Sequence, residues 1–131
     1  MRNFFLTGGA LTAAVAVALG AFGSHFLKSR LPESTLLTFE TGVRYQFYHA
    51  FALLVAGLGS DRWSSRWLKL AGLCFSSGII FFSGSLYAIT FWKLFQQEGI
   101  GVWGLITPAG GLLLLLGWIF LLRAFLSQQA S

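Results

Sequence analysis

Four long apolar segments divide the chain, and short connections separate them. They cover residues 4–27, 37–59, 68–91 and 102–126. Each is close to the ~20 residues that an α-helix needs to cross a lipid bilayer. Because short connections make successive helices antiparallel neighbours, the pattern predicts an all-α fold, an integral membrane four-helix up-down bundle. A proline in the first connection, KSRLPESTL, breaks the helix, and we expect Ser34 or Thr35 to cap the next one.

Composition places this bundle in lipid rather than in water. Hydrophobic residues make up 56% of the 131 residues and charged residues only 10%, with a mean hydropathy of +0.73. A soluble domain carries roughly 25% charged residues, so too little charge is present here to cover a surface in water. We therefore expect residues 1–131 to form a single transmembrane domain whose main partner is the lipid bilayer.

The positive charges give a modest indication of orientation, because lysine and arginine in short loops favour the cytoplasmic side. With both ends of the chain inside, the inner set is Arg2, Arg62, Arg66, Lys69 and Arg123, and the outer set is Lys28, Arg30 and Lys93. This bias predicts an N-in, C-in multi-pass protein of the cell membrane (cytoplasmic or inner). The basic residues are scattered singly instead of forming a patch, so we expect no nucleic-acid partner.

Small residues predict how the helices pack, because apolar burial does not drive one helix against another in lipid. The first segment is too long for the core of a signal peptide. It carries a helical stripe of Gly9, Ala13, Ala16, Gly20 and Gly23. The third segment carries Ser76, Ser77, Gly78, Ser83, Gly84 and Ser85. We expect packing surfaces in both segments, and a polar pathway along the serines is the alternative.

Pro108 makes the start of the fourth segment ambiguous. Proline removes a backbone donor and disfavours helical geometry at Thr107. The helix could be broken or kinked at this point. It could equally begin at Pro108, which suits the first turn of a helix, and leave GVWGLIT as an interfacial re-entrant stretch.

The second segment begins with polar residues, in the stretch FETGVRYQFYHA. At about 100° per residue, Glu40, Arg44 and Tyr48 share one face of a helix, and Tyr45 and His49 share an adjoining face. If the span starts near residue 37, Arg44 lies roughly 10 Å and His49 roughly 18 Å into the membrane. Intramembrane charges usually face the bundle interior and find partners.

We therefore expect Glu40 to pair with Arg44, in the favourable i, i+4 order. His49 should be neutral and bonded to Tyr, Ser or backbone atoms. Two interpretations of these residues remain open. They form a polar clamp that fixes the helix register, or they form a ligand site or a proton or ion relay.

Sequence gives no sign of a metal, a cofactor or an enzyme. His25 and His49 could both face the bundle, but the first lies at the interface and the second near mid-bilayer, which suits neither a haem pair nor a metal site without a carboxylate at that depth. Cys74 is the only cysteine, so there is no Cys-based metal motif. There is no Ser-His-Asp order, no pair of deep carboxylates and no Gly-rich phosphate loop.

Four motifs occur in one order along the chain. They are GAFGSHFL at 20–27, FETGVRYQFYHAFALL at 39–54, GSLYAI at 84–89 and ITPAGGLLLLLGW at 106–118. Together they resemble the small multi-pass membrane family known as domain of unknown function 423, which includes transmembrane protein 256-like proteins. The resemblance covers nearly the whole chain and implies an integral inner-membrane protein without an established activity. The recurrent family residues match Gly20, Gly23, His25, Glu40, Arg44, Tyr45, His49, Ser85, Tyr87, Thr107, Pro108, Gly110 and Gly111.

An up-down topology brings all four motifs into one half of the membrane. We expect a polar cluster there, a candidate ligand or structural site, formed by His25, Glu40, Arg44, Tyr45, Tyr48, His49, Ser85, Tyr87, Thr107 and Pro108. The favoured function is a non-enzymatic accessory or organising membrane protein, with a protein partner or a homo-oligomer as its assembly. The alternative is a small transporter or channel for protons, ions or solutes that acts as an oligomer.

Overall fold

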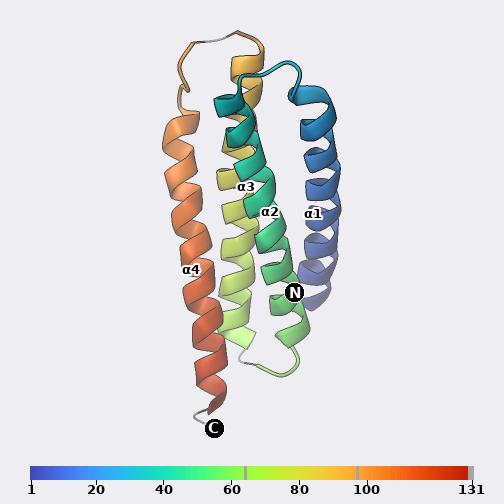
Figure 1. The fold of residues 1–131 in the computed structure, drawn as a ribbon. Helices are drawn as coiled ribbons and strands as arrows, with labels where there is room; N and C mark the ends of the chain where they lie inside the picture. The colour runs from blue at the N-terminus through green and yellow to red at the C-terminus, as the bar shows by residue number, and fades with distance from the viewer. Residues whose placement is uncertain (64, 97, 130–131) are drawn as a thin grey trace.

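The computed structural model of the chain describes residues 1–63, 65–96 and 98–129 (Figure 1). Within these residues the secondary structure is entirely helical. The elements are α1 (Arg2–Phe22), the π-helical turn η1 (Gly23–Leu27), α2 (Glu33–Gly59), α3 (Ser65–Leu94) and α4 (Trp103–Gln129). The helices run up and down, with both chain ends and the α2–α3 connection at the lower end of Figure 1. The predicted four-helix up-down bundle is confirmed.

Two helix starts differ from the sequence prediction. Pro32 itself caps α2, with φ −58° and ψ 151°, and its carbonyl accepts the amides of Thr35 and Leu36. The helix therefore begins right after the proline, and the predicted cap at Ser34 or Thr35 is wrong. A proline at the residue before the helix leaves the following amides free to bond back to it.

The start of α4 also differs, because the helix begins at Trp103 and continues through Pro108. The two predictions for Pro108, a break in the helix and a helix start, are therefore both wrong. Pro108 lies within the opening turns of α4, so only the Gly104 carbonyl loses its usual donor. The Thr107 hydroxyl donates to the Trp103 carbonyl at 3.0 Å, which adds a bond beside the proline.

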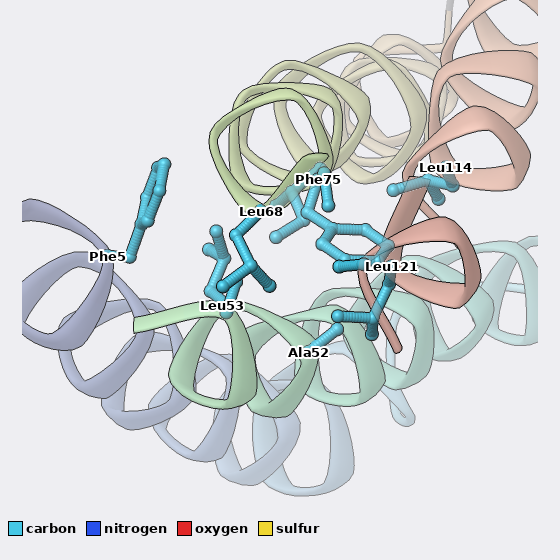
Figure 2. Close-up of a cluster of buried hydrophobic side chains, with 11 residues drawn as sticks. Phe5, Ala52, Leu53, Leu68, Phe75, Leu114 and Leu121 are labelled. Atoms are coloured by element: carbon cyan, nitrogen blue, oxygen red, sulfur yellow. The ribbon is translucent and has the colours of Figure 1, made fainter. Parts of the chain in front are cut away.

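The bundle is a row rather than a closed ring. α1 packs on α2, α2 on α3, and α3 on α4, so α1 and α4 lie on opposite flanks in Figure 1. A buried cluster in the half nearest the chain ends joins all four helices (Figure 2). Its larger members are Phe5 from α1, Leu53 from α2, Leu68 and Phe75 from α3, and Leu114 and Leu121 from α4.

The helices differ in how well they suit a membrane. Among the described residues, Arg2–Leu27, Arg66–Leu94 and Trp103–Ser127 are long and apolar enough to span one. α2 is 27 residues long, but the polar stretch near its start lowers its hydropathy. This least apolar helix lies between α1 and α3, where its neighbours cover much of it.

Close backbone approaches hold the row together. The predicted stripe on α1 packs against α2, because a Cβ on Gly9 would lie 2.9 Å from Leu54 and one on Gly23 would lie 2.7 Å from the Phe39 ring. On the other side of the row, a Cβ on Gly110 would overlap backbone atoms of Phe81 and Phe82. The TPAGG motif therefore sets the contact between α4 and α3.

This contact can be tested with Gly110→Ala. The added methyl group would meet backbone that cannot move aside, so we expect a loss of roughly 1–3 kcal/mol in the free energy of unfolding. Gly84→Ala on α3 is the matched control, because nothing lies within 4 Å of a Cβ there. The free energy of unfolding of each variant can be measured in detergent micelles, with far-UV circular dichroism as the signal. Equal stability of the two variants would contradict the close approach.

Candidate functional site

Gln46 is the centre of the polar residues, although the sequence prediction did not include it. Its side chain is buried in α2, with 5% exposure. The amide nitrogen donates to the Thr12 carbonyl of α1 at 2.9 Å, and the amide oxygen accepts the Tyr87 hydroxyl of α3 at 2.7 Å. One side chain thus connects three helices.

The spacing of the buried residues along α2 could have revealed Gln46. Thr35, Phe39, Gly42, Gln46, His49, Leu53 and Ala56 are all buried and recur at intervals of three and four. That interval marks one face of a helix. The prediction grouped residues by polarity, and the polar residues spread around the helix, so this buried face was missed.

His49 is the second connection between helices, and it is also buried. Its Nε2 accepts the indole N–H of Trp118 in α4 at 3.0 Å. Because an indole nitrogen only donates, Nε2 carries no proton, and Nδ1–H donates to the Tyr45 carbonyl at 2.7 Å. Both ring nitrogens are therefore hydrogen-bonded and the imidazole is neutral. The neutral ring and the backbone partner agree with the prediction, whereas the Trp118 partner on α4 was not predicted.

Tyr45 and Tyr48 are exposed and contact mainly other rings. The Tyr45 ring lies 4.8 Å from that of Phe82 and 5.9 Å from the imidazole of His49, measured between centroids. Both tyrosines, with His49 and Trp118, line a largely apolar groove of about 560 Å³ between α2 and α4. The rings of Tyr45, Tyr48 and Trp118 are all exposed at this groove.

Serine and threonine hydroxyls make further bonds around α3. Ser83 donates to the Gly42 carbonyl of α2 at 2.7 Å, and Ser85 bonds to Thr107 of α4 at 2.6 Å. Ser76 and Ser77 instead donate to carbonyls of their own helix. The serines of α3 therefore bond to neighbouring helices or to their own helix. This agrees with the predicted packing surface and not with a polar pathway along the serines.

Glu40 and Arg44 do not form the predicted pair. The salt bridge seen within the described residues is a different one, between Arg2 and Asp61 at 2.7 Å. Glu40 is half-buried and Arg44 is exposed, and both line a groove of about 410 Å³ between α1 and α2. The i, i+4 spacing places the two residues on one face, and both line the same groove, but they form no ion pair.

His25 and Pro108 take no part in the buried polar contacts between helices. Both are exposed, so the prediction that His25 faces the bundle is wrong. Gly23 and Leu27 form the buried side of the π-helical turn, and His25 lies midway between them, on the opposite side. The residues of the single pocket that the sequence predicted are therefore divided among separate interhelical bonds and several grooves, including those between α1 and α2 and between α2 and α4.

Those bonds leave little polar chemistry free inside the bundle. Among the described residues, every buried side-chain nitrogen and oxygen has a hydrogen-bond partner. No group of three or more His, Cys, Asp or Glu in the described parts of the chain is placed to hold a metal ion. The arrangement is suited to fixing helices relative to each other.

The apolar helices and their interhelical polar bonds define an integral membrane protein. The chain belongs to the family described as "Protein of unknown function (DUF423)", which matches residues 19–111, and the resemblance seen in the sequence is confirmed. A UPF0382 membrane protein of Staphylococcus aureus is 42% identical over 93% of this chain and 94% of its own.

Two further relatives extend this similarity across bacteria. The UPF0382 membrane protein YwdK of Bacillus subtilis is 38% identical over 92% of this chain and 94% of its own. The UPF0382 inner membrane protein YgdD of Escherichia coli is 33% identical over 92% of this chain and 87% of its own. No solved structure gives a significant match. The names of the relatives give a membrane location and no activity.

The Gln46–Tyr87 bond can be measured with a double-mutant cycle. Gln46→Leu and Tyr87→Phe each remove one partner, so we expect each to destabilise the bundle. The coupling between them should be about 0.6 kcal/mol, the average for hydrogen bonds between membrane helices, and at most about 1.7 kcal/mol. Ser77→Ala is a control, because that hydroxyl bonds within its own helix. Zero coupling in micelle unfolding would show that the bond contributes nothing.

Proposed function

We propose that the chain is a non-enzymatic organising protein of the cytoplasmic membrane, which uses the groove between α1 and α2 to dock another transmembrane helix. The observation that supports this is the placement of Glu40 and Arg44. Both side chains line a groove that opens away from the bundle, and neither has a polar partner among the described residues.

Such charges need a partner inside a membrane. A charged side chain at the centre of a spanning helix costs about 2.5–3.5 kcal/mol on insertion scales, and near the helix end the cost is lower. Arg44 lies about 16 Å along α2 from its first residue, at 1.5 Å per residue. A docked helix that carries complementary polar groups would remove the remaining cost.

Transport is less well supported by the same geometry. A path for ions or protons needs polar groups that are free to exchange partners, whereas Gln46, His49 and Ser83 are bonded to neighbouring helices. The two lateral grooves have mostly apolar linings. These polar groups are better suited to rigidity, which a docking surface requires.

The proposal includes a topology in which all four helices cross the membrane with both chain ends inside. α2 supports it, because the helix is antiparallel to the apolar α1 and connected to it by a short turn. Reporter fusions at each end, one active only in the cytoplasm and one only outside, test it. Activity of the outer reporter at either end would contradict it.

Site-specific photo-crosslinking tests the docking surface. A benzophenone side chain at Val17, which lines the groove, should form a protein adduct of defined mass in native membranes. Leu112 is the matched control, since both residues are 62% exposed and both lie in the half of the bundle that contains the end of α1 and the start of α4. Leu112 should give no such adduct. Lipid adducts alone from Val17 would contradict a docking function.

A further inference from the structure

We infer that the groove between α1 and α2 binds a second copy of this chain, through two reciprocal ion pairs between Glu40 of one copy and Arg44 of the other. The inference rests on the proposed docking function and names its partner. Its basis is the charge of the groove, which is complementary to itself.

The groove presents both signs of charge on one face of α2. Glu40 and Arg44 line it beside Val43 and Phe47, so the acid and the base lie together along one side of an apolar strip. The opposite wall comes from α1 and η1 and includes Val17, Gly20 and Ser24. Gly20 has no side chain, and a Cβ there would lie 3.6 Å from Val43 of α2, at ordinary contact distance. The α1 wall is therefore built partly from small residues, which favour the close approach of another helix.

Symmetry makes the two charges meet. Two copies in one membrane have the same orientation, so the twofold axis of their dimer runs along the membrane normal and the same patch is used on both. Arg44 lies one turn, about 6 Å, deeper than Glu40. An arginine side chain reaches that far toward the membrane surface. Each guanidinium can thus pair with the carboxylate of the other copy, which gives two equivalent ion pairs.

A lipid headgroup fits the groove less well. A phosphate would satisfy Arg44, but it would also lie near the Glu40 carboxylate, which repels it. The second copy supplies an acid for the base and a base for the acid. The assembly also stops at two copies, because each copy covers the groove of the other and neither of these two grooves is left free.

Charge exchange tests the dimer. Glu40→Arg gives a chain with two bases in the groove, and Arg44→Glu gives a chain with two acids. Each variant alone should lower the dimer association constant roughly tenfold, because both interchain pairs become repulsive. The measurement is Förster transfer between C-terminal fluorophores in lipid vesicles over a range of protein-to-lipid ratios. Far-UV circular dichroism confirms that each variant retains its helices.

A mixture of the two variants is the decisive sample. In a mixed dimer every acid faces a base, so the association constant should return to the wild-type value, as it should for the double variant Glu40→Arg/Arg44→Glu. Restoration in the double variant without restoration in the mixture would show that the two residues pair within one chain. That result would overturn the inference, as would a wild-type chain that stays monomeric.

The crosslinking experiment separates this inference from the docking function itself. A Val17 adduct with twice the mass of the chain agrees with the second copy. An adduct with another protein, together with no self-association in vesicles, would overturn the inference and leave the docking function standing. Lipid adducts alone would overturn both.

Discussion

Helices in lipid gain nothing from excluding water, so this bundle depends on close packing and on hydrogen bonds between helices. The Gln46 amide bonds to α1 and α3 at once, while Gly110 brings the α4 backbone against that of α3. The two devices complement each other. Small residues allow the approach, and the polar bonds then fix the rotation and height of each helix.

The row arrangement explains why the polar residues of α2 take different partners. Because α2 lies between α1 and α3 and reaches α4 through His49, each side of the helix faces a different neighbour. Gln46 lies on the side covered by α1 and α3, whereas Glu40 and Arg44 line the lateral groove along α1. A stretch that forms one cluster along the sequence is therefore divided among several contacts. The unpaired charges remain on the side that is free to meet another molecule.

Part of the site was predictable from residue types and spacing. The glycine and alanine stripe of α1 packs as its periodicity indicates, and His49 is neutral and bonded as its depth requires. Gln46 was missed because the residues were grouped by polarity and not by the buried face of α2, to which Gln46 belongs. The Glu40–Arg44 pair was wrong because sharing a helix face permits contact without requiring it. His25 was misplaced because the buried side of the turn belongs to Gly23 and Leu27, and His25 lies opposite both.

The sequence by itself determined the membrane setting, the four helices, their up-down order and the small residues at which they pack. These follow from local properties: apolar length, helical periodicity and short connections. Only the tertiary structure decided which neighbour each polar side chain of α2 bonds, and that α1 and α4 lie on opposite flanks. The physical reason is that periodicity defines the faces of a helix, while the identity of the neighbour on each face depends on how all the helices pack together.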